Sequence, residues 1–227
     1  MNEKTDSIRR RMRTPRAAAI AGIVFSLLFS TSLIFMWVSV PANPLGPATP
    51  VIKHMKAISF SLNLLPFAGI AFLWFIAVVR DRLGEVEDRF FSTVVLGSGL
   101  LFTAMIFSAA AVAGAIITVL GNGSENLLQS GSYALGRAEV AQTMHIYAMR
   151  MAGVFMITTS TISLRTRIFP RWMVVFGYFL AMVLLLSVGS IEWIPLVFPL
   201  WVLLISVHIL IQNLHGQSEA ALREQGP

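Results

Sequence analysis

The feature that most constrains this chain is a series of six apolar runs, each long enough to form a helix that crosses a bilayer. A membrane-spanning helix needs about 20 mostly apolar residues, because each residue advances the helix by about 1.5 Å and the hydrocarbon core is about 30 Å thick. Runs of this kind, bounded by charged residues, Pro or Gly, occupy 17–40, 57–79, 90–120, 141–163, 172–188 and 194–211. The sequence therefore predicts an all-α polytopic membrane bundle of six transmembrane helices.

The composition agrees with a membrane environment. Hydrophobic residues make up 56% of the 227 residues and charged residues only 12%, whereas a soluble domain carries roughly 25% charged residues. So few charges cannot cover a water-exposed surface, which argues against a soluble enzyme, a nucleic-acid-binding protein and a disordered protein. The chain has no cysteine, so disulfides, thiolate metal sites and thiol nucleophiles are excluded.

The basic residues that flank the runs predict the orientation of the chain, because Lys and Arg concentrate on the cytoplasmic side. The outer segments 41–56 and 121–140 are rich in Pro, Gly, Asn and Ser and are expected to be surface loops. With the N-terminus inside, they hold only Lys53, Lys56 and Arg137, and most other Lys and Arg residues are cytoplasmic. We therefore expect a basic cytoplasmic segment at 1–16, a six-helix domain at 17–212 and a cytoplasmic tail at 213–227. The run from Arg9 to Arg16 is expected to bind anionic lipid headgroups of a bacterial cytoplasmic membrane.

Small residues in the third run predict close helix packing. Helices in a bilayer associate through small residues and a few hydrogen bonds, because lipid is as apolar as a leucine side chain. This run is therefore expected at the centre of the bundle, packed within one subunit or against a second copy in a homo-oligomer. The residues expected to pack are Gly97, Ala104, Ser108, Ala110 and Gly114.

Pro66 lies near the middle of the second run, where it is expected to kink the helix because it removes one backbone hydrogen bond. Asn63 lies within one turn of it. An amide at this depth has two interpretations. It forms a hydrogen bond to a neighbouring helix, or it belongs to a binding site at the broken backbone.

Arg150 is the one charge inside a predicted span. It lies roughly 22 Å along the helix from the cytoplasmic boundary at Arg165, within a core about 30 Å thick. A side chain at this depth is either an anchor that reaches the outer interface or part of a functional site. Thr143 and Tyr147 fall near the same helical face, and His145 falls on another.

These polar groups suggest an anion pathway. An outer vestibule containing Lys53, His54, Lys56 and Arg137 would attract anions. A cavity lined by Arg150, Tyr147, Thr143 and Asn63, with His145 as a further candidate, would receive them. The sequence thus predicts a channel or transporter for a small anion or anionic solute. The alternative is a non-catalytic membrane subunit or scaffold of a larger complex.

Enzymatic signatures are absent from the sequence. Zinc-protease, P-loop, nucleophile-elbow and dinucleotide-binding motifs do not occur. We therefore expect no enzymatic activity, no metal, no cofactor and no nucleic-acid partner.

Several short segments resemble a family of small six-span inner-membrane proteins of actinobacterial type. The resemblance implies a six-span bacterial membrane protein and implies no particular activity. It is carried by FLWF at 72–75, RDRLG at 80–84, EDRFF at 87–91, LGSGLLF at 96–102 and HIYAMR at 145–150.

Overall fold

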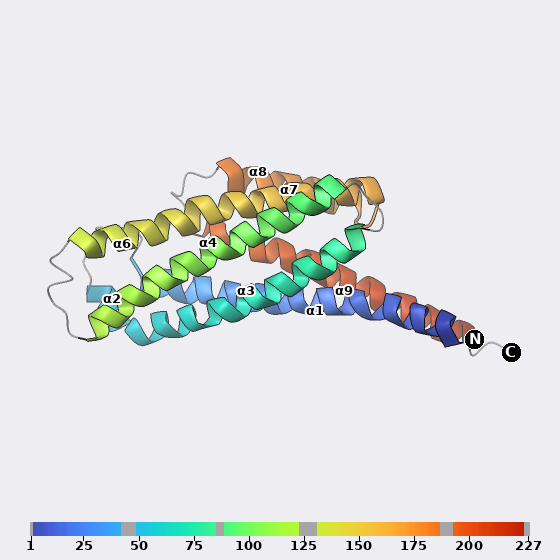
Figure 1. Cartoon of the computed structure of the whole chain (residues 1–227), viewed down its shortest axis with the longest axis horizontal. Coiled ribbons are helices and arrows are strands. Elements are labelled where there is room, and N and C mark those ends of the chain that lie inside the picture. Colours follow the sequence, from blue (N-terminus) through green and yellow to red (C-terminus); the bar gives the residue numbers. More distant parts are fainter. Residues whose placement is uncertain (1, 42–48, 85–88, 123–130, 187–192, 225–227) are drawn as a thin grey trace.

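The computed structural model describes the chain as an elongated bundle of antiparallel helices (Figure 1). It describes residues 2–41, 49–84, 89–122, 131–186 and 193–224, with side chains for 16–41, 49–80, 90–122, 131–186 and 193–214. This part of the chain is all-α, which confirms that part of the predicted fold class. The side chains of Arg9 to Pro15, expected to bind lipid headgroups, lie outside the described residues.

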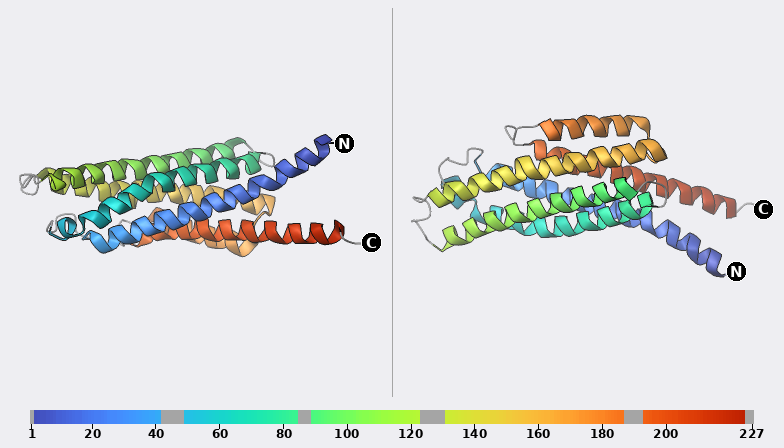
Figure 2. Two further views of the ribbon diagram at one scale, coloured as in Figure 1. Left: turned by 90° about the horizontal axis from the view of Figure 1, so that it is seen from below. Right: turned by 45° about the horizontal axis from the view of Figure 1, so that its top comes forward.

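The helices follow one another up and down the bundle. α1 begins and α9 ends at the same end, and α1 and α4 end at the other (Figure 1). Figure 2 shows α8 on the outside of the bundle, packed mainly against α7. In chain order the elements are α1 (Asn2–Ser39), α2 (Thr49–Lys53), α3 (Met55–Gly84), α4 (Arg89–Gly121), α6 (Gly131–Gln142), the π-helix η1 (Thr143–Ala148), α7 (Met149–Thr166), α8 (Arg171–Leu186), the 3-10 helix η2 (Ile194–Leu196) and α9 (Val197–Glu224).

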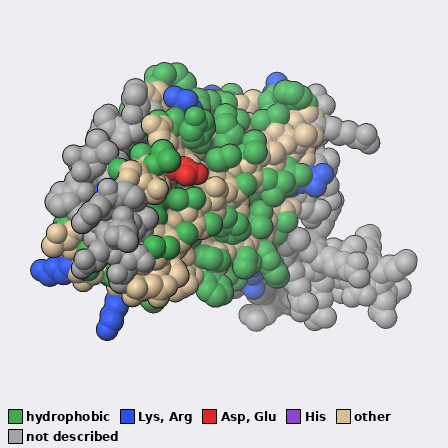
Figure 3. Space-filling view, turned by 60° about the vertical axis from the view of Figure 1, so that its left-hand side comes forward, with side chains coloured by type: hydrophobic (Ala, Val, Ile, Leu, Met, Phe, Trp, Pro, Cys, Tyr) green, Lys and Arg blue, Asp and Glu red, His purple; other side chains and the backbone are tan. Residues whose placement is uncertain are grey.

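Four of these helical segments are long and apolar enough to cross a membrane: Arg16–Ser39, Met55–Arg80, Phe90–Gly121 and Ile194–Leu214. α8 is apolar but shorter. Large apolar side chains also lie on the outside of the bundle, for example Val38, 70% exposed, and Trp74, 66% exposed. Figure 3 shows a face on which most side chains are uncharged. A bundle that is apolar inside and outside is suited to lipid rather than water.

The predicted connection between the third and fourth runs is partly helical, which corrects the sequence interpretation. Residues 121–140 were expected to form a surface loop, yet α6 begins at Gly131 and continues without a break through η1 into α7. Tyr133 and Arg137, one helical turn apart, are both buried against the bundle. The tertiary contacts of this face stabilise a helix that its weak apolar periodicity did not indicate.

A cluster of phenylalanine side chains fills the middle of the bundle. α1, α3, α4, α7 and α9 each contribute at least one ring, and every ring is at most 2% exposed. Ring centroids are 4.6 Å apart for Phe25 and Phe72 and 4.7 Å apart for Phe102 and Phe198, in tilted and edge-to-face arrangements that aromatic pairs favour. The members of this phenylalanine cluster are Phe25, Phe29, Phe72, Phe102, Phe155 and Phe198.

Two buried serines join α1 to α3. The Ser32 hydroxyl donates to the Ser61 carbonyl at 3.0 Å, and the Ser61 hydroxyl donates to the Ser32 carbonyl at 2.8 Å. The two hydroxyl oxygens are themselves 2.8 Å apart. Such reciprocal bonds require the two backbones to approach closely, which small side chains permit.

Most of the small residues of α4 that were predicted to pack do not face the interior of the subunit. Packing against a second copy, the other predicted arrangement, stays a prediction. Ala104 and Ser108 are exposed, and a Cβ added at Gly97 or Gly114 would have nothing within 4 Å. Only Ala110 packs against the core, where it is partly buried. The inward face of α4 instead combines Phe102 and Ile106 with a different set of small residues. The buried small residues on this face are Ser98, Gly99, Ala109 and Ala113.

Candidate ligand-binding cavity

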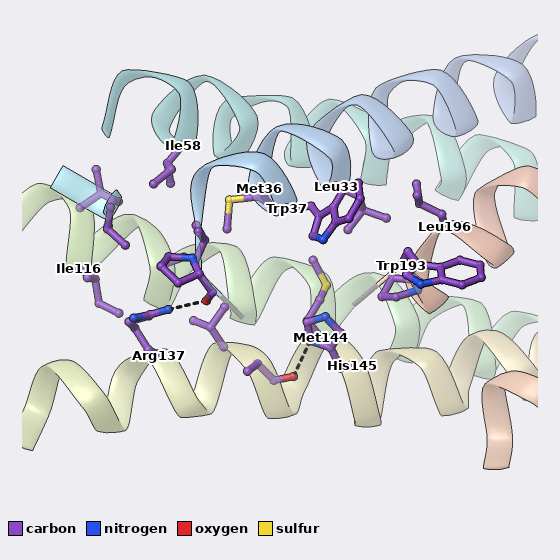
Figure 4. A pocket seen from close by; sticks show the side chains of 18 of the residues that line it. Leu33, Met36, Trp37, Ile58, Ile116, Arg137, Met144, His145, Trp193 and Leu196 are labelled. Atoms are coloured by element: carbon purple, nitrogen blue, oxygen red, sulfur yellow. Dashed lines mark hydrogen bonds between the residues drawn. The ribbon is translucent and has the colours of Figure 1, made fainter. Parts of the chain in front are cut away.

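A cavity of about 560 Å³ lies at the end of the bundle opposite the start of α1 (Figure 4). Its walls come from the end of α1, α2, the start of α3, the end of α4, α6, η1 and η2. The cavity adjoins the phenylalanine cluster along α1, on which Leu33 lines the cavity one helical turn after Phe29. The described lining residues are Leu33, Met36, Trp37, Val40, Pro41, Val51, Ile58, Ala113, Ile116, Ile117, Tyr133, Arg137, Val140, Ala141, Met144, His145, Trp193, Pro195 and Leu196.

The cavity walls are mainly apolar. Most lining side chains are aliphatic or Met, and the two tryptophans add apolar ring surface. Walls of this kind offer little to replace the hydration shell of a small ion. They suit a ligand that is itself largely apolar, and the volume lies within the usual range of small-molecule sites.

Arg137 supplies a positive charge to one end of the cavity. The side chain is only 9% exposed, and its Nη2 atom donates to the Pro41 carbonyl at 2.8 Å. Its Cζ atom lies 5.7 Å from the centroid of the Tyr133 ring. Arg137 therefore fixes α6 to the end of α1 and places a guanidinium in the cavity wall.

Tyr133 brings a hydroxyl to the same end. The residue is 5% exposed, lines the cavity and packs with Val51, Ile58 and Ile117. Its hydroxyl is buried and has no hydrogen-bond partner among the described residues. A buried polar group without a partner costs about 1–3 kcal/mol, so such groups are rare in folded proteins.

The π-helix η1 forms the next part of the wall. Met144 and His145 lie on it, and both line the cavity. The Nδ1 atom of His145 lies 3.1 Å from the Ala141 carbonyl, a geometry in which the ring N–H donates (Figure 4). Single π-helical turns within α-helices occur frequently at functional sites. The presence of η1 in this wall therefore favours the cavity as a functional site.

Of the ligand-pathway residues predicted from the sequence, His145 alone lines this cavity. Arg150 and Asn63 are exposed, Tyr147 is 55% exposed and Thr143 is half-buried. The structure therefore does not gather these residues around the cavity. Pro66, predicted to kink α3, and the vestibule residues Lys53 and Lys56 are also exposed and lie outside the lining set.

Arg150 points away from the core because the buried face of α7 is apolar. Met149, Ala152 and Phe155 occupy that face and are fully buried. Turning a guanidinium toward them would remove its charge from polar surroundings at a high cost. The outward orientation agrees with the interpretation of Arg150 as an anchor that reaches the interface.

Arg137, one of the residues predicted for the outer vestibule, lines the cavity, whereas the sequence interpretation missed Tyr133, Trp37 and Trp193. A signal for Tyr133 was present: Tyr133, Arg137, Val140, Ala141 and Met144 follow the spacing of one helical face. Assigning 121–140 to a loop concealed that face. Trp37 and Trp193 are far apart in the sequence, and only the tertiary fold brings both of them to the wall of one cavity.

Comparison with protein-family models, with curated protein sequences and with solved structures finds no match to this chain. The functional inference therefore depends on the cavity and on the groups that line it.

Proposed function

We propose that this protein is an integral membrane protein that binds an apolar or amphipathic ligand in the cavity at the α6 end of the bundle. The observation that supports this function best is the apolar lining of a cavity of about 560 Å³. Trp37 and Trp193 line it and are 54% and 62% exposed, so the cavity borders the outside of the bundle at their position.

The proposal includes six membrane crossings, with both ends of the chain in the cytoplasm of a bacterium. The four long apolar helices support a membrane location, and the beginning of α1 and the end of α9 at one end of the bundle are compatible with an even number of crossings. The basic flanks support the cytoplasmic side for that end. The basic run up to Arg16 would then contact anionic headgroups.

Binding is favoured over the anion conduction that the sequence suggested. A conduction path would have to continue from the cavity through the bundle, where the phenylalanine cluster packs closely. The rings of Phe72 and Phe102, for example, have centroids 5.2 Å apart. Arg150, the residue around which a path was expected, faces outward.

A membrane subunit or scaffold is the second candidate function. It is favoured by the exposed small residues of α4, including Ala104 and Ser108. Small residues that face outward in a membrane helix leave room for the close approach of another helix. Copurification of a second membrane protein from native membranes would support this candidate.

The proposed binding function is tested by filling the cavity. Ala113 lines it from α4, so Ala113→Phe should place a ring in the ligand volume. Ala111 lies on the exposed face of the same helix, which makes Ala111→Phe a matched control. Binding of hexadecanol to the protein in nanodiscs is measured by displacement of a fluorescent fatty alcohol.

We expect Ala113→Phe to abolish displacement and Ala111→Phe to leave it as in the unmodified protein. Both variants are first checked for a single symmetric peak in size-exclusion chromatography. Saturable binding that is unchanged by a correctly folded Ala113→Phe variant would show that the ligand lies elsewhere and overturn the proposal.

A further inference from the structure

We infer that the ligand is an amphiphile with an anionic oxygen head group, a carboxylate or a phosphate, bound by Tyr133 and Arg137. Its hydrocarbon chain extends along the apolar walls and leaves the bundle between Trp37 and Trp193. This inference rests on the proposed binding function and adds the chemical class of the ligand.

The Tyr133 hydroxyl carries the first step. It is buried in the cavity wall and has no hydrogen-bond partner among the described residues. A phenol hydroxyl is a good donor, and an oxyanion in the cavity would give it a strong acceptor. A purely hydrocarbon ligand would leave this hydroxyl without a hydrogen-bond partner.

Arg137 determines the sign of the head group. Among the described residues that line the cavity, it carries the formal charge, and none of them is Asp or Glu. Guanidinium and phenol groups both donate hydrogen bonds, and a carboxylate or phosphate only accepts them when it is fully ionised. The spacing of four residues places the two donors on one face of α6, with the guanidinium carbon 5.7 Å from the Tyr133 ring.

The positions of the charged and apolar lining residues determine how the hydrocarbon chain of the ligand would lie in the cavity. Arg137 lies toward one end of the cavity, and Trp193 and Leu196 lie toward the other (Figure 4). α6 lies at the end of the bundle where α1 and α4 end, whereas α9, which begins directly after Leu196, starts nearer its middle (Figure 1). A bound amphiphile would therefore have the orientation of a membrane lipid, with its head at the interface and its chain toward the bilayer centre.

The exposed tryptophans mark the place where the hydrocarbon chain of the ligand would reach the surrounding lipid. Trp37 at the end of α1 and Trp193 at the start of η2 both line the cavity, and more than half of each side chain is exposed. An opening between two helical elements at membrane depth leads into lipid, because lipid surrounds the bundle there. Entry from the bilayer requires no transfer of the hydrocarbon chain through water.

The test compares four probes on the full-length protein in nanodiscs of a zwitterionic lipid. Hexadecanoic acid, hexadecyl phosphate and hexadecanol share one chain and differ in head group, and inorganic phosphate has no chain. We expect both anionic amphiphiles to bind about tenfold or more tightly than hexadecanol at neutral pH, and inorganic phosphate to show no saturable binding.

Two pairs of variants locate the head group. Tyr133→Phe removes only the unpartnered hydroxyl and should weaken both anionic amphiphiles about tenfold and hexadecanol less, because a neutral alcohol oxygen is a weaker acceptor than an oxyanion. Tyr147→Phe, on the exposed surface of η1, is its control. Arg137→Gln should weaken the anionic amphiphiles roughly a hundredfold, and Arg150→Gln should have no effect. If Arg137→Gln does not fold because the bond to Pro41 is lost, Tyr133→Phe decides alone.

The outcomes separate this inference from the proposed function. Equal binding of hexadecanol and the two anionic amphiphiles, or unchanged binding by Tyr133→Phe, would overturn the anionic head group and leave the binding function intact. Failure of all three amphiphiles to bind would overturn both. Inorganic phosphate that binds as tightly as hexadecyl phosphate would show an anion site without a role for the chain.

Discussion

Arg167 ends α7 in the left-handed region of the backbone, with φ 55°. It is the non-glycine residue with positive φ among the described parts of the chain. A residue with a Cβ atom pays roughly 1 kcal/mol for this conformation, which glycine adopts freely at helix ends. The tight reversal from α7 to α8 at Pro170 requires the chain to turn here.

Replacing this residue by glycine should therefore stabilise the protein. We expect Arg167→Gly to raise the free energy of unfolding by about 0.5–1 kcal/mol relative to Arg167→Ala. The alanine variant also lacks the guanidinium but retains Cβ, so the comparison isolates the backbone. Thermal unfolding in detergent micelles measures the difference, and a lower midpoint for glycine than for alanine would contradict the expectation.

The two arginines on the α6–α7 helix show what the sequence reveals about single residues. The sequence predicts a functional or anchoring role for Arg150 because it interrupts an apolar run, whereas it places Arg137 in a loop among polar neighbours. In the structure Arg150 is exposed and Arg137 is buried. The sequence indicates how far along a predicted membrane span a residue lies. The direction of a side chain depends on which face of its helix meets the other helices, and a single sequence does not specify that.

At the level of elements, α1 is positioned by close contact with two neighbours at Gly22. A Cβ atom added there would meet Ser206 Oγ on α9 and lie 2.9 Å from a ring carbon of Phe75 on α3. Gly97 on α4 offers the opposite case, because a Cβ atom there would have nothing within 4 Å. One substitution thus has different consequences in two helices of the same bundle.

Gly22→Ala should separate α1 from its partners and lower the free energy of unfolding by about 1–3 kcal/mol. Gly97→Ala should leave it unchanged or raise it by up to about 1 kcal/mol, because alanine favours the helix. Unfolding of both variants by a denaturing detergent, followed by circular dichroism, provides the measurement. Equal effects of the two substitutions would contradict the close contact at Gly22.

The elements themselves were largely predictable. The apolar runs at 57–79 and 90–120 correspond closely to α3 and α4, because long apolar stretches have few alternatives to a helix. The π-helical turn at Thr143–Ala148 was not predictable, since no residue pattern specifies it. Which small residues of α4 face the interior was not predictable, because small residues can pack inside a bundle or face outward, and both arrangements satisfy the same pattern.

For the whole molecule, the absence of cysteine makes the proposed membrane topology directly testable. Single cysteines introduced at Lys53, Arg171 and Gln212 would be the only thiols in the chain, and all three positions are exposed. We expect a membrane-impermeant maleimide to label Lys53→Cys in intact cells and to label Arg171→Cys and Gln212→Cys only after permeabilisation. Labelling of Gln212→Cys in intact cells would place the end of α9 outside and contradict the six crossings.

The phenylalanine cluster has a consequence for how such a protein would respond to its membrane. Because the rings close the bundle between the cavity and the opposite end, ligand exchange would be confined to one leaflet. Two bilayers with the same total lipid composition but opposite transverse asymmetry would then load the protein to different extents. The fraction of the protein with a bound amphiphile would then depend on two rates: the rate at which amphiphiles flip between the leaflets, and the rate at which they are removed from the leaflet that the cavity faces.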